Sequence, residues 1–245
     1  MRRLRVAIAF LTIFPVGPRG AVAEADLGGS FLWFPAVGLL IGGGLVGIHA
    51  VVQGLSPLVA GVCVLLGWVL LTGALHLDGL GDLCDGLYAG VTPEERLRIM
   101  KDPHVGVMAV VAVTLALIFK FALLSNYPIA AMNRALVVAP CLGRYAMVVL
   151  GTTLPYARVE GGTAASFVRF SGVGSLVGAT VIMFLISVCA LGAGGVLLLG
   201  FSLLVVLVFL RAVFQRALGG VTGDALGAAC EITEVLALVG IALCA

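Results

Sequence analysis

Residues 57–87 read PLVAGVCVLLGWVLLTGALHLDGLGDLCDGL, so an apolar stretch runs directly into a cluster of three aspartates. The apolar part, residues 57–77, is long enough to cross a bilayer as an α-helix, which needs about 20 residues. The whole chain shares this character: it is 62% hydrophobic and 11% charged, with a mean hydropathy of +1.22. An ordinary soluble domain is about 25% charged. The sequence therefore predicts an integral membrane protein.

Apolar windows of spanning length recur along the chain. They fall at residues 31–52, 57–77, 105–124, 129–153, 173–190, 196–214 and 225–244. We expect an all-α fold, a polytopic membrane bundle of about seven transmembrane helices, forming one domain over residues 1–245. The segment from Leu4 to Phe14 is apolar but too short to cross, and no small-residue cleavage site follows it. We expect it to be an N-terminal half-helix at the membrane interface rather than a signal peptide.

Basic residues are distributed asymmetrically. Eleven of the 14 lie in the N-terminal segment and in ranges 78–104, 154–172 and 211–224, whereas the loops near 53–56, 125–128 and 191–195 carry no charge. Because basic loops face the cytoplasm, we expect a protein of the bacterial cytoplasmic (inner) membrane with these ranges inside. Lys120 and Arg134 lie within spans, where we expect them to snorkel toward an interface. A net charge of +2 spread in this way does not favour nucleic-acid binding.

The three aspartates share one helical face. Asp78, Asp82 and Asp85 are spaced i, i+4 and i+7, within about 60° of one another around a helix. No basic residue stands three or four positions away to pair with them, and carboxylates this close repel at the edge of a bilayer. A divalent metal ion is the simplest counter-charge. We also expect the glycines beside them to leave room for a large ligand.

A second acidic motif, GGVTGDALGAACEITE, occupies residues 219–234. Asp224 and Glu231 are seven residues apart and share a helical face, and Glu234 follows one turn later. Such groups cannot face lipid cheaply, so they should face the bundle interior or a wet cavity. We expect the two acidic helices to meet, and we leave open whether Glu234 is functional or a hydrogen-bonded structural carboxylate.

Several motifs together resemble the adenosylcobinamide-GDP ribazoletransferase family, also called cobalamin 5′-phosphate synthases. They are FPVGP at 14–18, FPAVGLLIG at 34–42, HLDGLGDLCDG at 76–86, RLRIMKDPHVG at 96–106, LGR at 142–144, YARVEG at 156–161 and GGVTGDALGA at 219–228. The resemblance covers nearly the whole chain in the right order. One departure is His104, preceded by Pro103, where the family more often has arginine after serine.

This resemblance implies an integral membrane enzyme of late cobalamin (vitamin B12) biosynthesis. It would join α-ribazole, or its 5′-phosphate, to adenosylcobinamide-GDP, release GMP and require Mg²⁺. Its partners would be these two substrates and the lipid bilayer, and an oligomer is possible. The residues agree with such chemistry, because Mg²⁺ prefers carboxylate and phosphate oxygens and suits a diphosphate.

We assign candidate roles on this basis. The metal ligands are expected to be Asp78, Asp82, Asp85 and Asp224, and the catalytic carboxylates are expected among Asp82, Asp85, Asp224 and Glu231, one of them as general base. We expect the basic side chains of Lys101, Arg144 and Arg158 to bind phosphate groups. Arg144 lies within a span, where its partner could instead be a carboxylate of the bundle. His76 is equally a packing residue or a substrate contact.

Two alternatives remain at this stage. A CDP-alcohol phosphatidyltransferase also places aspartates at helical spacing, but its longer D-x-x-D-G-x-x-A-R motif differs from the D-x-x-x-D-x-x-D found here. A cation transporter would be expected to carry repeated halves and sites near the bilayer midplane. In this chain the acids cluster at one end and the halves do not resemble each other.

Overall fold

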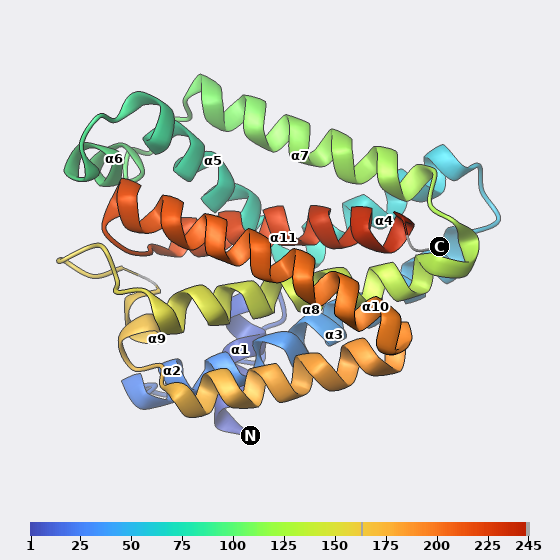
Figure 1. Ribbon diagram of the computed structural model, residues 1–245, viewed down its shortest axis with the longest axis horizontal. Helices are drawn as coiled ribbons and strands as arrows, with labels where there is room; N and C mark the ends of the chain where they lie inside the picture. The colour runs from blue at the N-terminus through green and yellow to red at the C-terminus, as the bar shows by residue number, and fades with distance from the viewer. Residues whose placement is uncertain (163, 244–245) are drawn as a thin grey trace.

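The computed structural model describes residues 1–162 and 164–243, and within these ranges the ordered elements are helices (Figure 1). They are α1 (Arg2–Leu11), α2 (Glu24–Ser30), the 3₁₀ helix η1 (Phe31–Trp33), α3 (Phe34–Val52), α4 (Pro57–Thr72), α5 (Leu75–Ala89), α6 (Pro93–Ile99), α7 (Val107–Ser125), α8 (Ile129–Thr153), α9 (Ala165–Arg169), α10 (Val173–Leu218) and α11 (Gly223–Leu243). The expected all-α class is confirmed.

In the part of the chain that the structure describes, six helical stretches are long and apolar enough to cross a membrane, or seven if the bent pair α4 and α5 counts as one span. The range α10 contains two of them, Val173–Gly192 and Gly194–Leu218, because Gly192 takes a left-handed conformation with φ 68°. Large apolar side chains such as Leu115, Leu185 and Phe209 are 60%, 56% and 65% exposed. Side chains of this kind belong against lipid, so the expected polytopic membrane bundle is confirmed.

The window 57–77 is not one straight helix, and here the sequence prediction was wrong. Helix α4 ends at Thr72, α5 begins at Leu75, and the two axes differ by 85°. Gly73 and Ala74 both have positive φ, 59° and 57°, and their N–H groups donate to the carbonyls of Leu70 and Val69. This closing turn satisfies the carbonyls at the end of α4. The aspartates therefore stand on a separate helix whose direction is set by the turn.

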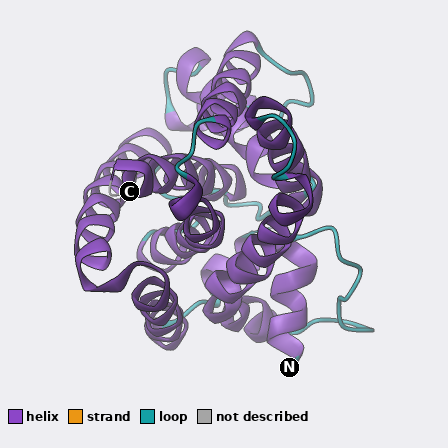
Figure 2. Cartoon of the chain, turned by 90° about the vertical axis from the view of Figure 1, so that its right-hand side faces the viewer, coloured by secondary structure: helices purple, strands orange, loops and turns teal. Residues whose placement is uncertain are grey.

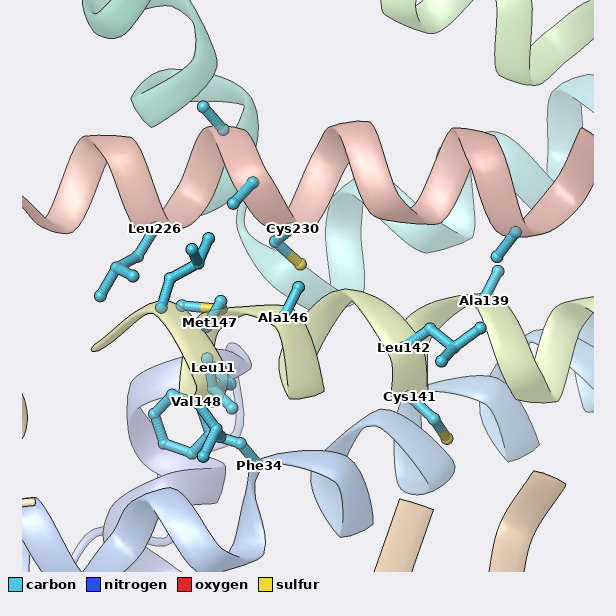
Figure 3. Packing of buried hydrophobic residues seen from close by; sticks show 14 of the residues in the cluster. Leu11, Phe34, Ala139, Cys141, Leu142, Ala146, Met147, Val148, Leu226 and Cys230 are labelled. Atoms are coloured by element: carbon cyan, nitrogen blue, oxygen red, sulfur yellow. The ribbon is translucent and has the colours of Figure 1, made fainter. Parts of the chain in front are cut away.

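The centre of the bundle is α8, which packs between α3 and α11 (Figure 3). Glycines bring these backbones close: a Cβ on Gly38 of α3 would lie 2.6 Å from Cys141 Cα, and one on Gly143 of α8 would lie 2.8 Å from Cys230 Sγ. Small residues at helix contacts are the usual means of packing in membranes. Figure 2 looks along the bundle, so the long helices are seen close to end-on.

Loops distant in sequence meet at one end of the bundle, where α5, α6 and α9 also lie (Figure 1). Ala157 N–H donates to Val221 O over 2.8 Å and Val221 N–H donates to Pro155 O over 2.9 Å, a single parallel bridge between two loops. A Cβ on Gly220 would lie only 2.2 Å from Pro155 O, so glycine is required there. The bridge fixes the segment after α8 against the start of α11.

Candidate active site

The two acidic helices meet, as expected from the sequence. A Cβ on Gly79 of α5 would lie 2.8 Å from the carbonyl oxygen of Asp224, and one on Gly227 of α11 would lie 3.3 Å from His76 Cα. Gly79 therefore admits the backbone of α11, and it also lines the cavity described below, so the room for a ligand that we expected beside this glycine stays a prediction. The close approach places Asp224 beside the aspartates of α5.

Asp224 is held by Arg158. The guanidinium Nη2 donates to Asp224 Oδ2 over 2.6 Å, with the side chains only 12% and 21% exposed. Thr222 Oγ1 donates to the same oxygen over 3.4 Å. The second oxygen, Oδ1, accepts no hydrogen bond from the described residues. The predicted phosphate ligand Arg158 and the predicted metal ligand Asp224 are thus brought together as an ion pair.

Asp78 and Asp82 complete an acidic cluster with Asp224. The charge of Asp82 interacts with those of Asp224, Asp78 and Arg158. In the described part of the chain, neither Asp78 nor Asp82 accepts a hydrogen bond or forms an ion pair. Three carboxylates with one guanidinium leave excess negative charge, which a divalent cation would neutralise.

The fit of this cluster to Mg²⁺ can be judged from its donor atoms. Oxygens of Asp78 and Asp82 and one oxygen of Asp224 lack protein partners, and carboxylate oxygen is the ligand that Mg²⁺ prefers. Within residues 1–162 and 164–243, however, no three acidic, imidazole or thiol groups already surround one point closely enough to hold a metal ion. The chemistry of the donors fits, but the side chains would have to rearrange to gather around one ion.

Asp85 has a different surrounding. Its Oδ2 accepts from Gly106 N–H over 2.7 Å and its Oδ1 accepts from Ala109 N–H over 2.9 Å. A Cβ on Gly106 would lie 2.4 Å from Asp85 Oδ1. A carboxylate at this point accepts hydrogen bonds from N–H groups that have no partner within the helix, and its negative charge interacts favourably with the positive end of the α7 dipole. The structure therefore gives Asp85 a capping role, and its predicted metal and catalytic roles stay predictions.

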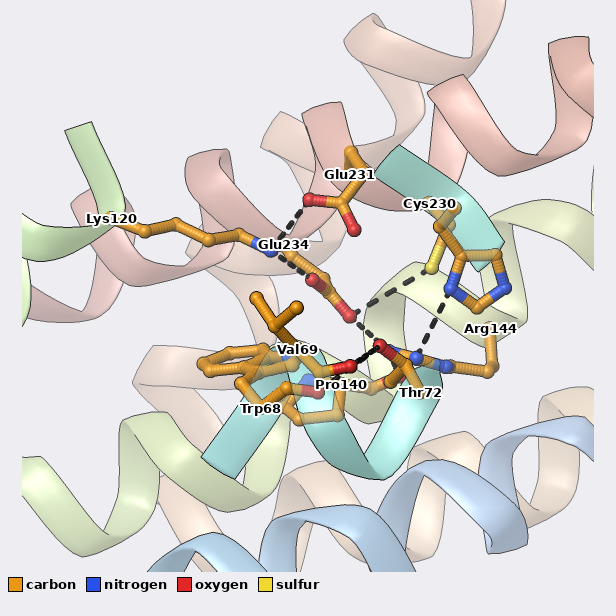
Figure 4. A network of polar contacts seen from close by, with 10 residues as sticks. Trp68, Val69, Thr72, Lys120, Pro140, Arg144, Cys230, Glu231 and Glu234 are labelled. Carbon is orange, nitrogen blue, oxygen red and sulfur yellow. Dashed lines mark hydrogen bonds and ion pairs between the residues drawn. The ribbon is translucent and has the colours of Figure 1, made fainter. Parts of the chain in front are cut away.

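Glu231 and Glu234 lie in a buried charge network (Figure 4). Lys120 Nζ of α7 lies 2.7 Å from Glu231 Oε2 and also pairs with Glu234, which pairs with Arg144 of α8. Lys120 is 2% exposed and stands over the ring of Trp68 at 4.7 Å. The expectation that Lys120 snorkels was wrong, because two glutamates supply its counter-charge inside the bundle. The side chain of Arg134 is exposed, near the start of α8.

The network gives these residues protein partners. Glu231 pairs with a lysine and is 6% exposed, so its predicted catalytic role stays a prediction. The ion pairs of Glu234 with Lys120 and Arg144 agree with a structural role, which is one of the two roles that the sequence left open. Arg144 is 0% exposed and pairs with that carboxylate, which is the bundle partner that the sequence allowed for, and its phosphate contact stays a prediction. Arg144 also reaches His76, with Nη2 lying 3.2 Å from His76 Nδ1.

A cavity of about 190 Å³ lies between α5, α11 and the loop after α8. Its polar lining comes from His76, Asp78, Tyr156, Arg158 and Asp224. Burial raises the pKa of the Tyr156 phenol, against the opposing effect of Arg158, so the hydroxyl is neutral at physiological pH. The rest of the lining is largely apolar. Five polar groups from three distant segments thus converge on one small space.

A second, more open hollow of about 500 Å³ lies on the other side of α5, against α7. Its lining is mostly aliphatic, with Asp78 and Asp82 as its carboxylates. Asp78 therefore borders both spaces.

The remaining predicted phosphate ligand, Lys101, is not among the residues that line the cavity. Its Nζ is 2.6 Å from Glu160 Oε2, and both side chains are exposed, at 45% and 83%. His104 Nδ1 lies 2.6 Å from Asp102 Oδ1, and hydrogen bonds from His104 lower the pKa of that carboxyl group. The phosphate role of Lys101 stays a prediction.

Sequence reasoning assigned no role to several residues of the site. Tyr156 and Glu160 stand within the YARVEG motif, which was the available signal for them. The apolar lining includes Phe10, Phe31 and Phe167, which come from separate segments and have no shared motif. Only the fold brings these rings to the cavity.

Fold and site together define a polytopic helical membrane protein with a carboxylate-rich cavity at one end of the bundle. The profile of the cobalamin-5-phosphate synthase family matches residues 3–242, and the chain belongs to this family.

Curated relatives cover essentially the full length. Proteins named adenosylcobinamide-GDP ribazoletransferase are 34% identical in Acetivibrio thermocellus over 98% of this chain and 96% of the relative, and 39% identical in Stutzerimonas stutzeri over 99% and 98%. A relative of the same name in Chlorobium phaeobacteroides is 38% identical over 100% of both chains. No solved structure matches the chain.

Proposed function

We propose that the protein transfers the phospho-cobinamide moiety of adenosylcobinamide-GDP to α-ribazole or α-ribazole 5′-phosphate. The products are GMP and adenosylcobalamin or its 5′-phosphate. Full-length similarity to proteins of this name supports the proposal and decides against a CDP-alcohol phosphatidyltransferase or a cation transporter. The observation that carries it is the convergence of Asp78 and Asp224 with Arg158 on one cavity.

In the proposed reaction a ribazole hydroxyl attacks the phosphorus that is bonded to cobinamide. A new phosphorus–oxygen bond forms, and the bond to the GMP oxygen breaks. Asp224 lines the cavity and keeps one oxygen free of Arg158, so it is suited to accept the hydroxyl proton. Arg158 offers charge to the phosphates at the same place. Mg²⁺, held by Asp78 and Asp82, would neutralise charge on the diphosphate.

The proposal includes a location. The basic loops and the acidic cluster lie at the same end of the bundle, and basic loops mark the cytoplasmic side. We infer that the protein is integral to the bacterial cytoplasmic membrane with its site open to the cytoplasm, where nucleotide substrates are found. Cysteine-reactive labelling of single-cysteine variants in intact cells tests this orientation.

The test of the reaction is GMP release by the purified chain in lipid. Adenosylcobinamide-GDP, α-ribazole and Mg²⁺ are supplied together, and each is omitted in turn. The Asp82→Asn variant is expected to lose activity by about 100-fold or more, whereas Glu94→Gln, which changes an exposed acid on α6, keeps it. Absence of GMP release from the wild-type chain, with transport of a divalent ion instead, would overturn the proposal.

A further inference from the structure

One end of the cavity beside α5 is aromatic. Phe10, Phe31 and Phe167 line it, and the rings of Phe10 and Phe167 stack with centroids 4.3 Å apart. Phe31 and Phe167 are 1% and 3% exposed, with centroids 6.0 Å apart. None of these side chains carries a polar atom. This end can therefore accommodate a flat apolar ring but cannot satisfy hydrogen-bonding groups on it.

His76 lines the same cavity, and its side chain carries a buried hydrogen-bond donor without a protein partner. Arg144 Nη2 lies 3.2 Å from His76 Nδ1, and because arginine has only donors, Nδ1 must accept. The imidazole proton is then on Nε2, since a proton on Nδ1 would face the guanidinium. His76 is 1% exposed, and its Nε2 has no hydrogen-bond partner in the described chain.

These two features define one ligand chemistry. We propose that the cavity binds a planar, largely apolar bicyclic ring against its stacked phenylalanines, and that His76 Nε2–H donates to a single unprotonated nitrogen of that ring. The inference rests on the proposed function, because the base of α-ribazole is dimethylbenzimidazole. Once its N1 is joined to ribose, that base has one acceptor, N3, and an otherwise apolar surface.

The lining discriminates between the ring systems of the two substrates. Guanine carries an amide and an exocyclic amine, whose donors and acceptors would find no partners among Phe10, Phe31 and Phe167. A corrin ring is far too large for about 190 Å³. With the benzimidazole at the aromatic end, we expect the attached ribose to lie toward the polar lining, so that its hydroxyl is near Asp78 and Asp224.

His76 is thereby assigned as a specificity residue, and Arg144 as the residue that positions it. The hydrogen bond from Arg144 fixes the tautomer, and Glu234 fixes Arg144 through their ion pair. The buried network thus has a connection to the cavity. A site built to satisfy one ring nitrogen discriminates strongly against an analogue without it, because the donor is then left unpaired.

The experiment compares α-ribazole with an indole analogue in which C–H replaces N3, leaving shape and apolar area nearly unchanged. Steady-state GMP release by the full chain in lipid gives kcat/KM for each compound at saturating adenosylcobinamide-GDP. The wild type is expected to favour α-ribazole by about tenfold, the value of one buried hydrogen bond. His76→Phe removes the donor, so its preference should fall to about one, while His76→Gln, which restores an N–H donor, should regain part of it.

A wild type that uses both compounds equally would overturn the inference, and so would a His76→Phe variant that still discriminates tenfold. If His76→Phe does not fold, the wild type and His76→Gln still decide the question. The proposed function is tested separately by GMP release with α-ribazole itself. Release without discrimination would refute only the role of the cavity, whereas no release would refute both.

The aromatic wall has its own matched pair of variants. Phe167→Leu should raise KM for α-ribazole several-fold and leave KM for adenosylcobinamide-GDP unchanged, because a stacking surface is lost. Phe34→Leu is the control. The ring centroids of Phe34 and Phe31 are 4.8 Å apart, so Phe34 belongs to the same aromatic cluster, but it does not line the cavity. Equal effects of the two changes on KM for α-ribazole would contradict the proposed ring site.

Discussion

Arg158 and Asp224 are 66 residues apart in sequence, yet their side chains form a 2.6 Å ion pair beside the cavity that both residues line. The bridge between Tyr156 and Val221 explains how, since it holds the two loops in register just before both residues. The pairing prepares a positive and a negative group for a diphosphate before any substrate arrives. It also requires that both loops keep their shape.

Arg158→Lys is expected to reduce GMP release by about 10- to 100-fold, the cost of one charge-assisted hydrogen bond in the transition state. Lysine keeps the charge but cannot donate from two nitrogens in a fixed plane. The measurement is kcat/KM for adenosylcobinamide-GDP, with Arg98→Lys, an exposed change on α6, as the control. Unaltered kinetics in Arg158→Lys would show that the guanidinium does not contact the phosphates.

Asp78→Asn and Asp82→Asn are expected to increase the Mg²⁺ concentration needed for half-maximal activity by roughly tenfold or more, because each removes a charged oxygen ligand. Activity is measured over a Mg²⁺ titration at fixed substrate. Glu94→Gln serves as the control and should leave the titration midpoint in place. If both aspartate variants retain the wild-type midpoint, the metal is held elsewhere.

Asp85→Asn should behave differently from its two neighbours. An amide offers one acceptor oxygen where Gly106 N–H and Ala109 N–H now bond to two, so we expect a loss of about 1–2 kcal/mol in the free energy of unfolding. Thermal unfolding in detergent measures this loss. If capping is its only role, the Mg²⁺ midpoint should stay unchanged, and a shift as large as that of Asp82→Asn would instead support the predicted metal role of Asp85.

The sequence was sufficient to predict the spans and the meeting of α5 with α11, because both follow from hydrophobic length and from the cost of carboxylates in lipid. It could not show the 85° break at Gly73, since a glycine within an apolar run is compatible with a continuous helix. The capping of α7 by Asp85 was equally hidden. It depends on where another helix begins in space, and spacing along α5 says nothing about that.

The charged residues within spans show the same limit. Lys120 could snorkel or find a partner, and its partners stand 111 and 114 residues later on α11. The aromatic end of the cavity is a further case, because Phe10, Phe31 and Phe167 come from three segments of ordinary apolar sequence. A carboxylate in a membrane span indicates function because burying its charge costs free energy, whereas a phenylalanine that contacts a ligand cannot be told from a packing residue by sequence.

The buried network gives the last prediction. Glu234→Gln leaves Lys120 and Arg144 with only Glu231 as a counter-charge, so we expect the free energy of unfolding to fall by about 3–5 kcal/mol. The double variant Lys120→Met with Glu231→Gln removes one charge of each sign and keeps the Arg144–Glu234 pair, so it should lose much less. Thermal unfolding of both variants in the same lipid is the measurement. If the double variant is as unstable as Glu234→Gln, charge balance does not explain the network, and packing around Trp68 becomes the better account of its contribution.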